Sequence, residues 1–301
     1  AFKGQYDFAG DEVSIKDAYI RYIGFDRARI TLGHVKEPFS LEEQTSSKYI
    51  TFMERALPNA LSPGRNLGVV ADTRGPVAAG GWSAAVGVFG SGLDDAGPRD
   101  QGYGASARLT FAPLAQADRF VHLGVAAGHR ELEEGDALRL RTRPESHVTS
   151  TRLVDTGTLG GAGEMSRYGV EAAFGFGPAA IQGEYMRGEV GLNGAPDPTF
   201  DGWYVQGSWF PTGESRRYDA EDGSFHRVRP RRALGDGGFG ALELGLRLSG
   251  IDLSDESVTG GEERNLTVGI NWHPNANVRF MANYVRVLDL DATGLEATDD
   301  T

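Results

Sequence analysis

The chain has 301 residues, the size of one large all-β unit or of two ordinary domains. It has a formal charge of −12 at pH 7, no cysteine and 43 glycines. The negative charge argues against nucleic acid as a partner, and no uninterrupted apolar run reaches the about 18 residues of a membrane-spanning helix. A chain without thiols suits the bacterial periplasm or outer membrane.

Apolar and polar residues alternate along much of the chain. Between residues 241 and 249, Leu occupies four successive even positions, and Glu243, Arg247 and Ser249 lie at odd ones. A period of two puts the two sets on opposite faces of a strand. Thirteen or fourteen such runs can be recognised, centred near residues 2–9, 14–24, 28–36, 67–74, 81–90, 103–111, 120–131, 137–143, 166–176, 179–189, 201–211, 239–251, 264–273 and 278–288.

The connections between these runs alternate roughly between short turns and long loops. Short turns are expected near residues 25–27, 177–178 and 274–277, and long loops at 37–66, 91–102, 144–165, 190–200 and 252–263. This is the layout of an outer-membrane barrel. Residues 212–237 are long where a short turn is expected, so this segment either contains an unrecognised strand or folds inward.

A membrane barrel and a soluble β-sandwich both alternate in this way, but a sandwich has about seven short strands per domain. About fourteen strands of near-uniform length without a domain break favour a single closed sheet. Most of the runs are about ten residues long, which is enough to cross a bilayer when tilted. We therefore predict an all-β fold, a transmembrane antiparallel β-barrel whose polar face lines water.

The insert at 38–66 interrupts the alternation. Ser40 followed by Glu43 fits a capping box, so a helix is expected to begin near Leu41 and to end at Leu57-Pro58-Asn59. A loop of this kind can fold into a wide barrel and narrow it. We expect residues 38–66 to form the constriction.

The insert "VKEPFSLEEQTSSKYITFMERALPNALSPGRNLGV" closely resembles the corresponding stretch of the phosphate-selective porin O and P family. The stretches "GWYVQGSWFPTGESRRYD" and "ERNLTVGINWHPNANVRFMANYVRV" are also similar to it, so the resemblance spans almost the whole chain. It implies a bacterial outer-membrane barrel of about 16 strands, commonly trimeric, that passes phosphate, polyphosphate or other small anions. By the same comparison the chain, one porin domain over residues 1–301, holds about 14 of these strands and lacks one at each end.

Basic residues supply the candidate anion contacts. In the insert, Lys48, Arg55 and Arg65 are balanced by three glutamates, so its net charge is zero. Strand positions assigned to the inner face add further arginines, which could guide anions along a low-dielectric wall. A neutral lumen of mixed sign or a cation preference remain alternatives, because Asp17, Glu171 and Glu243 share that face. The strand candidates are Arg21, Arg29, Arg108, Arg130, Arg167, Arg247 and Arg279.

No signature of an enzyme is recognisable. The sequence has no nucleophile elbow and no phosphate-binding glycine loop, and its six histidines show no zinc spacing. We therefore expect a porin without catalytic residues, cofactor or metal. Its expected partners are small anions, outer-membrane lipid and lipopolysaccharide, and two further copies of the chain. The alternative is a general or differently selective porin without a phosphate preference.

Overall fold

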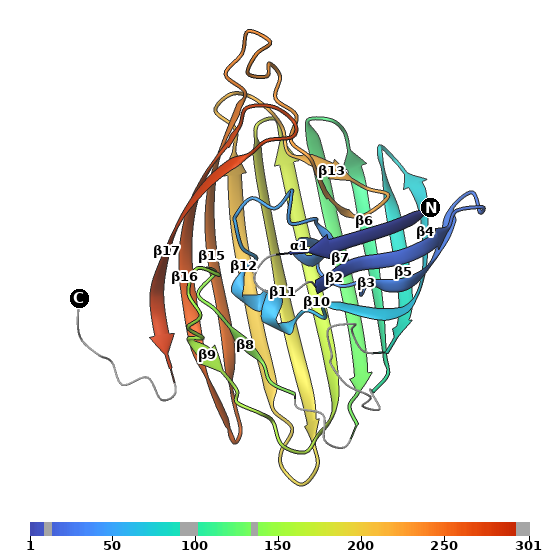
Figure 1. Cartoon of the computed structure of the whole chain (residues 1–301), viewed down its shortest axis with the longest axis vertical. Helices are drawn as coiled ribbons and strands as arrows, with labels where there is room; N and C mark the ends of the chain where they lie inside the picture. Colours follow the sequence, from blue (N-terminus) through green and yellow to red (C-terminus); the bar gives the residue numbers. More distant parts are fainter. Residues whose placement is uncertain (9–13, 91–101, 134–137, 293–301) are drawn as a thin grey trace.

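The computed structural model of the chain describes residues 1–8, 14–90, 102–133 and 138–292. Thirteen strands form one antiparallel sheet in which neighbours in sequence are neighbours in space (Figure 1). These strands are β1 (Phe2–Asp7), β2 (Ser14–Tyr22), β3 (Ala28–Lys36), β4 (Arg65–Val77), β5 (Gly80–Phe89), β6 (Gly104–Ala115), β7 (Arg119–Glu131), β10 (Ala162–Phe176), β11 (Ala179–Leu192), β12 (Thr199–Trp209), β15 (Ala241–Asp255), β16 (Val258–His273) and β17 (Phe280–Asp291).

The sheet has two unlike ends. Tight turns at residues 78–79 and 177–178 join β4 to β5 and β10 to β11 at the turn end. The connections 37–64 and 132–161 leave from the opposite end, which we call the loop end. Mostly short turns at one end and mostly long connections at the other are the arrangement that the sequence predicts, and they are typical of outer-membrane barrels. The connection 210–240 at the turn end and the tight turn 256–257 at the loop end are exceptions.

Side chains on the two faces of the sheet differ in polarity. On β15, Leu246 and Leu248 are exposed on the outer face, and Arg247 and Ser249 are buried on the inner face. A soluble sheet protein buries its apolar face, whereas this sheet presents it outward. The polarity therefore suits a barrel with a lipid-facing exterior and a polar interior.

Short elements occupy the interior of the curved sheet (Figure 1). They are helix α1 (Leu41–Gln44) and 3₁₀ helix η1 (Leu57–Leu61) between β3 and β4, and the hairpin of β13 (Arg217–Asp219) and β14 (Ser224–His226) between β12 and β15. A second small hairpin, β8 (Arg141–Thr142) with β9 (Val154–Asp155), lies between β7 and β10. Within the described residues, no helix has the length and apolar character needed to span a membrane.

Apolar packing is concentrated inside the sheet. Phe39, Leu57 and Leu61 form a buried cluster with Met165 of β10 and Phe200 of β12, each of them almost inaccessible to solvent. The segment between β3 and β4 is thus attached to the β10–β12 wall by a small hydrophobic core. Burial of such side chains contributes about 1.5–3 kcal/mol each.

Thirteen of the predicted strand runs form the sheet, and the structure corrects the fourteenth. The run 137–143 contains only the two residues of β8, and its residue 137 lies outside the described residues. Residues 252–263, expected as a long loop, instead continue β15 and β16 to a tight turn at 256–257. The segment 212–237 forms β13 and β14, and this hairpin folds inward.

Candidate functional site

The connection 37–64, which we call the inner segment, begins with a capped helical turn. The Ser40 Oγ accepts a hydrogen bond from the backbone N–H of Glu43 at 3.0 Å, and α1 begins at Leu41. This confirms the cap that the sequence predicts. Leu57-Pro58-Asn59 was expected to end a helix but instead starts η1, because proline fits a first helical turn, where its missing N–H needs no partner.

Buried polar contacts attach the inner segment to the wall. The backbone N–H groups of Leu41 and Glu42 donate to the Glu184 carboxylate of β11 at 2.9 and 2.7 Å. Arg247 of β15 is fully buried and pairs with Glu42 at 3.4 Å and with Glu145 at 2.6 Å. Burial raises the pKa of Glu42 above its ordinary value, and the Arg247 charge opposes this shift. Polar contacts from β11 and from β15 therefore hold the inner segment against the wall.

The β13–β14 hairpin meets the inner segment from the turn end. Phe225 packs in a buried cluster with Leu41 and Phe120, and its ring lies 5.5 Å from that of Phe120 in an edge-on arrangement. The Phe225 N–H donates to the Thr45 Oγ1 at 3.2 Å. Burial also raises the pKa of the neighbouring Tyr218. Two segments from opposite ends of the sheet therefore touch inside it.

A cavity of about 370 Å³ remains between these two segments and the inner face of β1–β6. Four carboxylate residues line it: Asp17, Asp72, Glu221 and Asp222. Seven basic residues line it as well, so the cations outnumber the acids: Lys3, Arg21, Arg29, Lys36, Arg55, Arg65 and Arg108.

Two of the lining arginines form ion pairs with acids that also line the cavity. Arg29 contacts Asp72 of β4 at 2.5 Å and Asp222 of the hairpin at 2.9 Å. Arg65 contacts Asp17 of β2 at 2.7 Å. Because Asp222 belongs to the β13–β14 hairpin, the Arg29 pair also joins the hairpin to the wall.

Arg21 differs from these residues. Its Nε donates to the Thr31 Oγ1 at 2.8 Å, and its guanidinium lies 5.0 Å from the centre of the Tyr19 ring. No carboxylate among the described residues forms an ion pair with it. Arg21 lines the cavity, and no ion pair with a described acid offsets its charge, which is the condition for contact with a mobile anion.

Five of the ten predicted basic residues line this cavity: Arg21, Arg29, Arg55, Arg65 and Arg108. Arg55 contacts Glu43 at 3.1 Å, and Arg108 contacts Glu171 at 2.6 Å. Both guanidinium groups also donate to backbone carbonyls. They are held in place and contribute less free charge than Arg21.

The other five lie elsewhere. Arg247 is enclosed between the wall and the inner segment, and Arg130 contacts Glu37 at 2.7 Å. Arg167 lies on the inner face of β10, where its Nε has no hydrogen-bond partner among the described residues. Lys48 and Arg279 line a second cavity of about 260 Å³, formed where the inner segment meets the β16–β17 turn. The predicted residues therefore occupy several places along the interior.

Sequence reasoning did not identify Lys36, whose Nζ contacts the Glu43 carboxylate at 3.2 Å in the cavity wall. Gly33 explains the omission. It has φ of 138°, a conformation that favours glycine, so the strict alternation that turns Arg29 inward does not extend past it. An irregular glycine in a strand was the available signal.

Comparison with known proteins gives consistent matches. The model of the family described as "Phosphate-selective porin O and P" matches residues 1–301. An uncharacterized protein of Caulobacter vibrioides is 33% identical over 294 residues, which cover 93% of this chain and 57% of that protein. Porin O of Pseudomonas aeruginosa is 28% identical over 325 residues, covering 97% of this chain and 72% of that porin. The chain thus spans a little over half of the first relative.

A solved structure supports the fold. The outer-membrane expressed OmpT of Vibrio cholerae matches with a TM-score of 0.52 at 12% identity, covering 93% of this chain and 72% of that one. At this identity the likeness concerns the fold alone. Together with the antiparallel sheet and its apolar exterior, it identifies the fold as a transmembrane β-barrel. The matches to the porin family model and to Porin O add that this barrel belongs to the bacterial outer membrane.

Proposed function

Because the chain belongs to the phosphate-selective porin O and P family, we propose that it forms a water-filled pore for the passive diffusion of anions, with a preference for phosphate or polyphosphate. It acts without chemical conversion of the solute. The inner segment and the β13–β14 hairpin form the constriction, and the pore works as a homotrimer in a membrane that contains lipopolysaccharide. The family membership supports the oligomer and the solute class.

One observation carries the proposal for this chain in particular: the excess of cations around the cavity of about 370 Å³ beside the inner segment. A low-dielectric wall strengthens the field of these charges and raises the local concentration of anions. A phosphate that enters the cavity meets the Arg21 guanidinium, which lacks an acidic partner among the described residues, and accepts charge-assisted hydrogen bonds from it.

The acids around the cavity make passage possible. Conduction requires binding that is favourable enough for entry and weak enough for release. Asp72 and Asp17 compete with the solute for Arg29 and Arg65, so these arginines do not hold a phosphate as firmly as unpaired groups would. Arg21 then attracts the anion into the cavity, and the arginines that are paired with acids offer it weaker contacts during its passage.

The proposal is tested by substitution of Arg21 with glutamine in planar bilayers. Under a potassium chloride gradient, the unmodified protein is expected to show a reversal potential set by chloride, and added phosphate should block the current. Arg21→Gln removes a charge-assisted donor worth about 1.5 kcal/mol, so the phosphate concentration for half block should rise about tenfold. Arg264→Gln is the matched control, because Arg264 is exposed on the outer face and pairs with Glu262 at 2.7 Å.

The other outcomes are equally informative. A reversal potential near zero, or one set by potassium, would contradict the anion preference and favour a general porin. Anion selectivity that Arg21→Gln leaves unchanged would contradict the role of Arg21. Absence of conductance in the unmodified protein would contradict the pore itself.

A further inference from the structure

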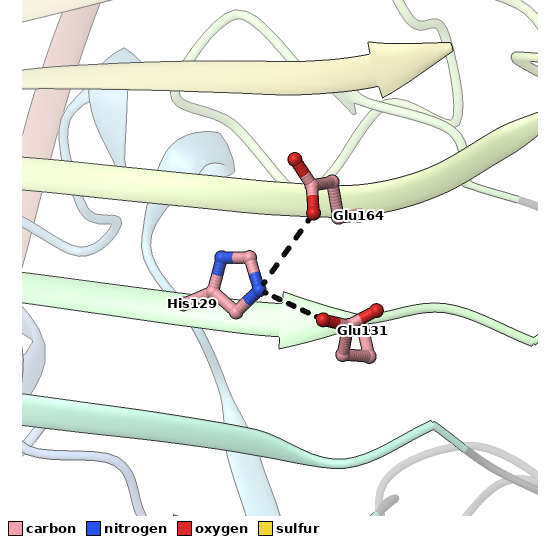
Figure 2. Close-up of side chains that lie close together, drawn as sticks. All are labelled: His129, Glu131 and Glu164. Atoms are coloured by element: carbon pink, nitrogen blue, oxygen red, sulfur yellow. Dashed lines mark hydrogen bonds and ion pairs between the residues drawn. The ribbon is translucent and has the colours of Figure 1, made fainter. Parts of the chain in front are cut away.

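Three potential metal ligands gather on the outer face of the sheet at its loop end: His129 and Glu131 of β7 and Glu164 of β10 (Figure 2). The strand register produces this arrangement. Glu131 lies two residues after His129 and so shares its face, and Glu164 is the direct cross-strand partner of Glu131. The next pair on the same face joins His129 to Ser166.

The spacing of the ligand atoms suits a metal ion. The His129 Nε2 lies 3.4 Å from a Glu131 carboxylate oxygen and 4.0 Å from a Glu164 carboxylate oxygen. All three ligand atoms lie within 4.8 Å of one another. A tetrahedral ion with bonds of about 2.1 Å has its ligands about 3.4 Å apart, so small side-chain rotations close the site.

The electrostatics of the pair also favour a cation. Glu131 and Glu164 are directly opposite on neighbouring strands, an arrangement that destabilises a sheet when both are charged. Among the described residues, no lysine or arginine forms an ion pair with either carboxylate. A second group of potential ligands, Asp219, Asp222 and His226, differs in this respect, because arginines already neutralise Asp222.

The histidine is oriented for ligation. Its Nδ1 lies 3.0 Å from the Ser166 Oγ, which can accept the Nδ1–H and leave the Nε2 lone pair facing the two carboxylates. The side chains of His129, Glu131 and Glu164 are 45%, 43% and 54% exposed. The ring is therefore held by one nitrogen while the other stays accessible to an ion from solution.

The position on the barrel places this group beside the lipid. Val125 on β7 and Tyr168 and Val170 on β10 are exposed on the same face, further from the loop end. They belong to the apolar exterior, and Tyr168 lies at its edge, where aromatic residues are expected. The three ligands begin where the apolar exterior ends.

We propose that His129, Glu131 and Glu164 form a binding site for a divalent ion of the zinc class on the outer face of the barrel. One imidazole and two carboxylates are a ligand set that zinc uses, whereas calcium and magnesium prefer oxygen ligands alone. Three protein ligands leave a fourth position open to water. The site is separate from the pore and does not depend on the proposed transport function.

The test is a titration of the purified full chain in detergent with zinc chloride, followed by calorimetry. One zinc ion per chain is expected for the unmodified protein. His129→Gln and Glu164→Gln should each weaken binding at least tenfold, because each removes a direct ligand. His147→Gln is the matched control: His147 is also exposed and contacts a single carboxylate, Glu54, at 2.5 Å, and its loss should leave binding unchanged.

Two readouts separate a built site from adventitious binding. Circular dichroism of each variant establishes that the sheet is intact, so that lost binding is not a loss of fold. Ser166→Ala should weaken zinc binding without abolishing it. Equal affinity of the unmodified protein and His129→Gln, or no saturable binding to the unmodified chain, would overturn the proposal and leave His129 as a hydrogen-bond partner of Glu131.

Discussion

Arg247 illustrates how one side chain can hold the interior together. It is fully buried, contacts Glu145 at 2.6 Å and Glu42 at 3.4 Å, and lies over the Phe52 ring at 4.4 Å. Replacement by methionine keeps the apolar volume but leaves two acids buried without their cation. Breaking a buried pair in this way costs about 3–5 kcal/mol. Arg247→Met should therefore lower the denaturant midpoint of the folded protein in detergent.

The control for this prediction is Arg264→Met. Arg264 pairs with Glu262 on the exposed outer face, where an ion pair contributes about 0–1 kcal/mol. Adding Glu145→Gln to Arg247→Met should recover part of the lost stability, since it removes one uncompensated charge. Equal midpoints for Arg247→Met and Arg264→Met would show that the buried network does not stabilise the protein.

Sequence reasoning recovered basic residues at this scale but not their partners. The alternation of side chains along a strand correctly assigns Arg21, Arg29 and Arg108 to the inner face, because this alternation follows from the geometry of a strand. Which arginine meets an acid depends on contacts across the barrel, such as Arg29 with Asp222, 193 residues apart. The outer-face group of His129, Glu131 and Glu164 has no motif spacing at all, since the register between two strands creates it.

At the scale of elements, the strands and the inward course of the segment after β3 were predictable, but the contacts that fix the inward segments were not. The alternation of apolar and polar residues depends only on neighbouring positions in the sequence. Thirteen predicted runs therefore match strands of the sheet closely. Residues 37–64 and 210–240 lack a repeating pattern, and their course is fixed by distant contacts. The run 137–143 alternates by composition, but its described residues pair with β9 and with no strand of the large sheet, so β8 is short.

The β13–β14 hairpin is expected to depend on Phe225. This ring is 2% exposed, packs with Leu41 and Phe120, and carries the Arg216 guanidinium 4.4 Å from its centre. Removal of a buried phenylalanine costs about 3–5 kcal/mol. Phe225→Ala should loosen the hairpin from the inner segment, widen the pore and raise the single-channel conductance measured in planar bilayers.

Phe239→Ala is the control for the hairpin, because Phe239 is 61% exposed and stacks on Trp272 outside the interior. Its conductance should match that of the unmodified protein. An unchanged conductance for Phe225→Ala, with the sheet intact by circular dichroism, would mean that the hairpin does not narrow the pathway.

At the scale of the whole molecule, the distribution of polarity is the reverse of that in a soluble protein. Inner-face residues such as Glu243, Arg247 and Asn271 are buried, and many large apolar side chains are exposed on the outer face. Exposed apolar patches of this extent mark contact with a membrane or a partner. The inner segment satisfies part of this buried polar surface: the Asn271 Nδ2 donates to the Thr51 carbonyl of that segment and to the Glu243 carboxylate of β15.

This polarity predicts how the barrel responds to a charge on its exterior. Leu246 lies near the middle of β15, is 55% exposed and faces outward beside Val268. An arginine at the bilayer midplane costs about 2–4 kcal/mol, and the cost falls to about 0–1 kcal/mol near the interface. Leu246→Arg should therefore lower the folded fraction recovered in lipid vesicles, as measured by circular dichroism. Val278→Arg, at an exposed position beside the turn end, should fold like the unmodified protein. Equal folded fractions for the two variants would show that lipid does not cover the middle of β15.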